Sequence, residues 1–129
     1  MRSLTALVML LSLLTAVAAA HAADVVPKTV QDLYTDCKSD NGTRRLQCVS
    51  YIEGLGGYMG LLGGLYRSPK SDDIAKAVFA PMSMCAPDRT TIGEWVQAFV
   101  NWTEKNPKER TQSKRYGVWI ALREAWPCH

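Results

Sequence analysis

The four cysteines are the residues of this chain best suited to chemistry. A cysteine thiolate can act as a nucleophile or hold a zinc ion, and zinc sites usually contain cysteines in C-x-x-C spacing. No two cysteines here have that spacing, and beyond residue 22 the only histidine is the terminal His129. We therefore expect two disulfides, no metal site and no bound cofactor. The cysteines concerned are Cys37, Cys48, Cys85 and Cys128.

Four cysteines can pair in three ways. In an antiparallel pair of helices, the end of one lies near the start of the next, which favours Cys37 with Cys48 across the first turn. The same reasoning favours Cys85 with Cys128, because these cysteines precede the third main helix and follow the last. Pairing of Cys48 with Cys85 and of Cys37 with Cys128 stays open, since the spatial order of the helices cannot be read from the sequence.

The acidic residues do not form a catalytic pattern. Catalysis by this chain would need a nucleophile beside a base, or two carboxylates acting as acid and base. Asp72 and Asp73 have the position of acids at a helix start. Glu53, Glu94 and Glu124 are scattered over separate predicted helices, and exposure is several times more common than burial for such residues. We expect no catalytic residues and no enzymatic activity.

The first 22 residues have the composition of a cleavable export signal. Arg2 supplies a positive charge, residues 4–14 form an apolar run, and Ala20-His21-Ala22 matches the A-x-A cleavage pattern. The run is shorter than the roughly 20 apolar residues of a spanning helix, so an uncleaved anchor is disfavoured. We expect residues 1–22 to be a signal peptide and residues 23–129 to be one mature domain in the periplasm.

The balance of charges argues against nucleic acid as a partner. The chain has 15 Lys and Arg against 12 Asp and Glu, which gives a formal net charge of +3. It contains no Lys/Arg-rich block of the kind that binds nucleic acid. After cleavage of the signal we also expect no membrane association.

Apolar residues recur with the helical period in four stretches. We place the main helices near residues 30–37, 44–66, 91–106 and 112–125, and a short helix capped by Ser71 over residues 72–79. Thr91 and Glu94 form a capping box. No stretch alternates as a strand would. The predicted fold class is all-α, a small disulfide-stapled bundle of four main helices plus one short helix.

The second predicted helix is unusual because it contains six glycines, each costing about 1 kcal/mol relative to alanine. Close approach of another helix is the expected reason, with Gly56, Gly60 and Gly64 at four-residue spacing. A kink or a frayed helix end is the alternative.

Four tryptophans could serve a core or a binding site. Trp95, Trp119 and Trp126 fit apolar helix faces, whereas Trp102 falls outside the apolar stripe of its helix. Aromatic residues are enriched at protein interfaces. Trp102 is therefore a candidate partner contact, although a core or incidental position is favoured.

Four sequence elements, taken in order, carry a resemblance. Residues 48–54 read C-V-S-Y-I-E-G, residues 85–87 read C-A-P, residues 106–108 read N-P-K, and residues 121–128 read A-L-R-E-A-W-P-C. They are similar to the C-x-x-Y-I-x-G, C-x-P, H-P-E and A-L-x-x-A-F-P-C elements of small periplasmic immunity proteins. These are the Rap/Tai-type proteins associated with type VI secretion.

The resemblance implies a disulfide-bonded helical bundle, often a homodimer, that binds a secreted cell-wall amidase and blocks its active site. It also implies structural roles for the motif residues Tyr51, Gly54, Pro87, Pro107 and Pro127. The expected partner is thus a secreted peptidoglycan amidase or a similar effector. A periplasmic acid or stress chaperone is the alternative function, because protonation of the acidic residues at low pH raises net charge and loosens a bundle.

Overall fold

The computed structural model describes residues 26–129, so the predicted signal peptide lies outside the described residues. This part of the chain is helical and contains no strand, and only an isolated bridge pairs Thr29 with Ser113. The prediction of an all-α fold is confirmed. The elements are α2 (Val30–Cys37), α3 (Gly42–Arg67), α4 (Asp73–Phe79), α5 (Ile92–Lys105) and α6 (Lys114–Ala125), with 3-10 turns at Ala80–Met82 and Pro107–Thr111.

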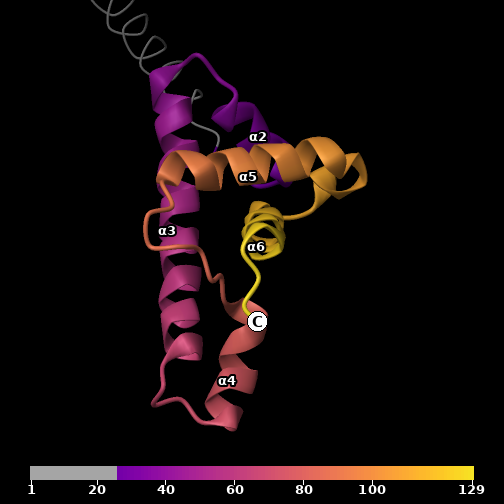
Figure 1. Cartoon of the computed structure of the whole chain (residues 1–129). Helices are drawn as coiled ribbons and strands as arrows, with labels where there is room; N and C mark the ends of the chain where they lie inside the picture. The colour runs from indigo at the N-terminus through magenta and orange to yellow at the C-terminus, as the bar shows by residue number, and fades with distance from the viewer. Residues whose placement is uncertain (1–25) are drawn as a thin grey trace, which may run out of the picture.

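Helices α3, α5 and α6 cross one another rather than running parallel. Figure 1 shows α3 along one side of the molecule, α5 running across its upper half, and α6 viewed nearly end-on. The short helix α4 lies beside the lower half of α3, and α2 lies behind α5. Helix α3 contacts each of the other four helices. It is therefore the element on which the rest of the domain is assembled.

Side chains at the helix starts explain where the helices begin. Thr29 and Thr91 each form a capping box, the latter as predicted with Glu94. The predicted cap Ser71 is wrong: Asp72 caps α4, and its carboxylate accepts from the Ala75 amide at 2.8 Å. The hydroxyl of Ser71 instead donates to the Leu65 carbonyl at 2.6 Å.

Two disulfides join the helices. One links Cys37 at the end of α2 to Cys48 in α3, and the other links Cys85 to Cys128 beyond α6. This is the pairing that the sequence favoured. By the loop-entropy model, closing loops of 11 and 43 residues contributes about 3 and about 4 kcal/mol respectively.

The core forms where α2, α3, α5 and α6 meet. Leu33, Ile52, Phe99 and Leu122 are fully buried there. Trp102 is only 7% exposed, so it belongs to the core although it falls outside the apolar stripe of its helix. Its ring packs over Gly117, where a Cβ would lie 3.4 Å from the ring atom Cζ3. The missing side chain on α6 makes room above all for the Val30 side chain, on which a Cβ at Gly117 would fall. A contact between Trp102 and a partner stays untested.

The glycines of α3 fall into two groups. A Cβ at Gly56 would meet Trp95 at 2.7 Å, and one at Gly63 would meet the backbone of Met84. The predicted contact at Gly64 is wrong, because nothing lies within 4 Å of a Cβ there. The eight residues from Gly56 to Gly64 rotate the side-chain direction about 80° away from the face of Gly56, whereas the seven residues from Gly56 to Gly63 rotate it by only about 20°. Gly63 therefore shares the inner face of Gly56.

Within residues 26–129, no helix is both long enough and apolar enough to cross a membrane.

Candidate partner-binding surfaces

The residues of the family motifs are dispersed over the molecule. Tyr51 lies half-buried in α3, with the Nζ of Lys114 4.0 Å from its ring centroid, and burial raises the pKa of its hydroxyl. The Pro87 carbonyl accepts from the amide and the hydroxyl of Thr90. Pro107 starts a 3-10 turn. The motif residues therefore occupy turns and helix faces and form no common site.

Two motif residues lie at the surface of the domain. Gly54 is exposed, and a Cβ there would have open space around it. Pro127 is exposed and separates the end of α6 from Cys128. The structural role expected for Gly54 therefore has no counterpart in contacts within the domain.

The described residues offer cavities and exposed surfaces as candidate sites. All four cysteines are in disulfides, and residues 26–129 contain no cluster of three histidine, cysteine or carboxylate side chains that could hold a metal ion. Glu53 is exposed, as its sequence context suggested. Two cavities, both open to solvent, are described below by their lining residues.

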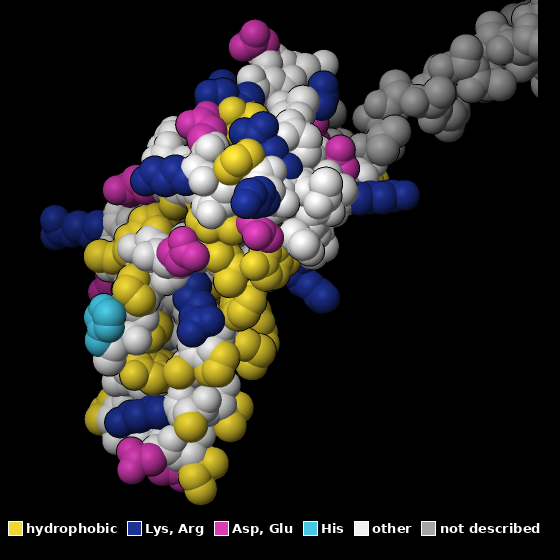
Figure 2. All heavy atoms as spheres, turned by 90° about the vertical axis from the view of Figure 1, so that its right-hand side faces the viewer, with side chains coloured by type: hydrophobic (Ala, Val, Ile, Leu, Met, Phe, Trp, Pro, Cys, Tyr) yellow, Lys and Arg dark blue, Asp and Glu magenta, His cyan; other side chains and the backbone are white. Residues whose placement is uncertain are grey.

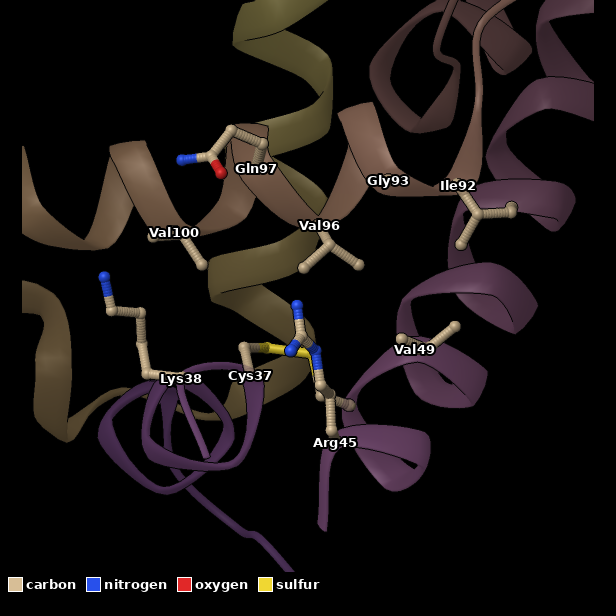
Figure 3. Close-up of a pocket in the computed structure, with 10 residues that line it drawn as sticks. Cys37, Lys38, Arg45, Val49, Ile92, Gly93, Val96, Gln97 and Val100 are labelled. Carbon is tan, nitrogen blue, oxygen red and sulfur yellow. A yellow bond between two sulfur atoms is a disulfide. The ribbon is translucent and has the colours of Figure 1, made fainter. Parts of the chain in front are cut away.

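The first cavity is a groove of about 560 Å³ above the Cys37–Cys48 disulfide. In Figure 3, Val96 and Val100 point from α5 toward the disulfide, while Lys38 and Arg45 extend into the groove from the opposite side. The Nζ of Lys38 lies 3.7 Å from a carboxylate oxygen of Glu104. The groove combines an apolar floor with a cationic rim.

The second cavity is a hollow of about 420 Å³ between α3 and α6, which we call the α3–α6 hollow. Its lining includes Tyr58, Met82 and Tyr116, which are 52%, 41% and 37% exposed. The hollow is lined by Leu55, Tyr58, Met59, Met82, Ser113, Arg115, Tyr116 and Trp119.

Interactions around the α3–α6 hollow fix its shape. The indole nitrogen of Trp119 donates to the Pro81 carbonyl at 3.2 Å, which ties the turn carrying Met82 to α6. The rings of Tyr116 and Trp119 lie 6.4 Å apart, and the guanidinium of Arg123 lies 5.6 Å from the indole. The aromatic wall of the hollow is therefore held in place before any partner arrives.

The hydrophobic surface is unevenly distributed. Figure 2 shows hydrophobic side chains gathered over the middle and lower parts of the molecule, whereas charged side chains are densest over the upper part. Figure 1 places α4 and the end of α3 in the lower part. Ile74 and Val78 of α4 are 76% and 55% exposed. Apolar surface is thus available for contact with other proteins.

Sequence reasoning did not identify the α3–α6 hollow. Its exposed members come from three separate segments, so no local spacing marks them. Trp119 fits the apolar face of the last helix in the sequence, and in the structure it lines the hollow together with Tyr116.

A comparison with protein families gives one match. The family model of the Rap1a immunity proteins matches residues 29–128, which is most of the chain. No curated protein and no solved structure matches the chain.

Proposed function

The chain belongs to the Rap1a immunity protein family, and we propose that it binds a secreted peptidoglycan amidase and blocks the active site of that enzyme. The family match over residues 29–128 is the observation that carries the proposal. Immunity proteins act by binding an effector, and they are generally not enzymes. The amidase as target, and a link to type VI secretion, rest on the Rap/Tai-type motifs of the sequence.

The compartment follows from the same proposal. An amidase acts on the cell wall, so its inhibitor must be present in the periplasm. The export signal predicted over residues 1–22 would deliver the protein there. Two disulfides are suited to an oxidising compartment.

The α3–α6 hollow is our proposed contact surface for the amidase. Tyrosine, tryptophan, methionine and arginine are enriched in protein interfaces, and a few such residues usually supply most of the binding energy. The hollow offers Tyr116, Trp119, Met82 and Arg115 within one concave surface. A rigid aromatic wall also reduces the entropy that ordering would otherwise cost on binding.

The experiment is calorimetric titration of the oxidised mature domain, residues 23–129, with a panel of purified peptidoglycan amidases. We expect binding to at least one amidase. Tyr116→Asp and Met82→Asp should weaken it by at least about tenfold, since each places a charge in a desolvated contact. Leu46→Asp is the matched control, because Leu46 is an exposed apolar residue near the start of α3 and outside the hollow, and it should bind as the wild type does.

The results separate the function from the location of the interface. Failure of the wild-type domain to bind any amidase would overturn the amidase proposal. Binding that survives both hollow substitutions would keep the function and move the interface elsewhere. Circular dichroism of each variant establishes that it is folded.

A further inference from the structure

The groove above the Cys37–Cys48 disulfide, which we call the cationic groove, is lined by basic but not by acidic side chains. Lys38 and Arg45 both line it, and the other described residues of its lining carry no charge. Figure 3 shows these two side chains extending into the groove from the same side, opposite Val96 and Val100. A ligand that complements this groove must therefore carry negative charge.

The two cations of the groove are available to a ligand. Within residues 26–129, Arg45 takes part in no ion pair, whereas the neighbouring Arg44 pairs with Asp36 at 2.6 Å. The Nζ of Lys38 lies 3.7 Å from a carboxylate oxygen of Glu104, too far for a hydrogen bond, and the Lys38 side chain is 55% exposed. An exposed ion pair of this kind contributes little to stability. A carboxylate of a ligand can therefore replace Glu104 at small cost.

The disulfide holds the backbone on both sides of this cationic rim. Lys38 directly follows Cys37, and Arg45 lies three residues before Cys48, on the same face of α3. The Cys37–Cys48 bond thus fixes the positions from which both side chains extend. Binding of a ligand then has to order only the two side chains and not the chain that carries them, which lowers the entropic cost.

The floor of the cationic groove suits small apolar groups. The disulfide and the side chains of Val49, Val96 and Val100 contribute to it, and no aromatic residue is among the described residues that line the groove. Three aromatic side chains line the α3–α6 hollow, so the two cavities differ in chemistry. The volume of about 560 Å³ is that of a site for a small ligand.

From the charge, the floor and the volume of the cationic groove, we propose that it binds a short acidic peptide with small apolar side chains. The ligand that we assign is the peptide stem of peptidoglycan, which combines alanine with residues that carry free carboxylates. This choice rests on the proposed function, which places the protein beside the cell wall. Carboxylates of the stem pair with Lys38 and Arg45, and an alanine methyl group contacts Val96 and Val100. Binding would hold the protein at the wall on which its amidase acts.

The test is a titration of the ¹⁵N-labelled oxidised mature domain with the free stem tetrapeptide, followed by NMR. The tetrapeptide contains L-alanine, γ-linked D-glutamate, meso-diaminopimelate and D-alanine. We expect a dissociation constant on the order of 100 micromolar, because the ion pairs form in an open groove. Amide shifts should be concentrated in residues 37–49 and 92–100. The same peptide with its carboxylates amidated is the ligand control, and it should bind at least about tenfold more weakly.

Charge reversals locate the site on the protein. Lys38→Glu and Arg45→Glu should each weaken binding of the tetrapeptide by at least about tenfold. Lys70→Glu is the matched control, because Lys70 is an exposed lysine in the turn between α3 and α4 and lies outside the groove. Raising the salt concentration from about 0.1 M to about 1 M should also weaken binding to the wild type, since the Debye length falls from about 10 Å to about 3 Å.

The outcomes distinguish this proposal from the proposed function. No shift at a peptide concentration about tenfold above the expected dissociation constant would overturn the proposal. Equal binding of the amidated peptide, or binding that survives both charge reversals, would overturn it as well. If the wild type ignores the tetrapeptide and the two variants lose binding to an amidase, the groove belongs to the amidase interface instead. The peptide titration contains no amidase, so its failure leaves the inhibitor role standing.

Discussion

Gly63 and Gly57 occupy the same helix, yet we expect the same substitution to have opposite effects at the two positions. A Cβ at Gly63 would fall on the carbonyl oxygen of Met84 and lie 3.0 Å from its carbonyl carbon, whereas a Cβ at Gly57 would meet nothing within 4 Å. Alanine is favoured over glycine in a helix by about 1 kcal/mol. The contacts around each position therefore decide the sign.

The backbone that faces Gly63 cannot easily move away. The Met84 amide donates to the Met59 carbonyl at 3.1 Å, and Met84 is itself only 1% exposed. The next residue, Cys85, is held by a disulfide and by a hydrogen bond from its amide to the Trp126 carbonyl at 3.0 Å. Displacing this segment costs overpacking strain of about 1–3 kcal/mol and weakens a hydrogen bond worth about 1 kcal/mol.

The net effects are large enough to measure. Gly63→Ala should lower the free energy of unfolding by about 2 kcal/mol after the gain in helix propensity, and Gly57→Ala should raise it by about 1 kcal/mol. For a domain of about 100 residues, each kcal/mol shifts Tm by about 4–8 °C. The assay is urea unfolding of the oxidised mature domain, monitored by tryptophan fluorescence.

Two results would contradict the contacts described for Gly63 and Gly57. If Gly63→Ala is as stable as the wild type or more so, the close approach between α3 and the segment around Met84 does not exist in solution. If Gly57→Ala is instead strongly destabilising, the open space around Gly57 does not exist in solution.

Three further predictions follow from local contacts. Amide hydrogen bonds from Thr29 and Thr91 lower the pKa of the Asp32 and Glu94 carboxyls, respectively. The contribution of these two carboxylates to stability is therefore full above about pH 5 and is lost as the pH falls through their lowered pKa values. Asp32→Asn and Glu94→Gln should each flatten the acid limb of a curve of unfolding free energy against pH. Replacing both cysteines of the 43-residue loop (Cys85–Cys128) by serine should cost about 4 kcal/mol in chemical unfolding, against about 3 kcal/mol for the 11-residue loop (Cys37–Cys48). Gly56→Ala should lower Tm less than Gly63→Ala does, because the facing atoms belong to the Trp95 and Leu122 side chains rather than to backbone; equal losses would contradict this reading.

Local signals in the sequence predicted the helices well. The capping box of Thr91 and Glu94 sets the start of α5, and Asn106 ends this helix at the residue before Pro107, as the sequence indicated. The disulfide pairing followed from the same local logic, since it needs only the helix ends and their order. These features depend on residues close together in the chain.

The features that sequence reasoning missed depend on contacts between helices. Trp102 is buried because its ring packs over Gly117 of α6, and no pattern within α5 reveals that contact. Gly63 rather than Gly64 meets a neighbour because of where the segment at Met84 crosses α3. The α3–α6 hollow combines residues from three segments, so its existence required the crossing angles of the fold.

The most direct test of the account is the initial rate of peptidoglycan cleavage by an amidase, measured at increasing ratios of the oxidised mature domain. We predict that for the amidase it binds, the rate falls in proportion to the added protein and reaches zero near an equimolar ratio. A rate that is unchanged at tenfold excess, for every amidase of the panel, would contradict the proposal that this protein acts by blocking an amidase.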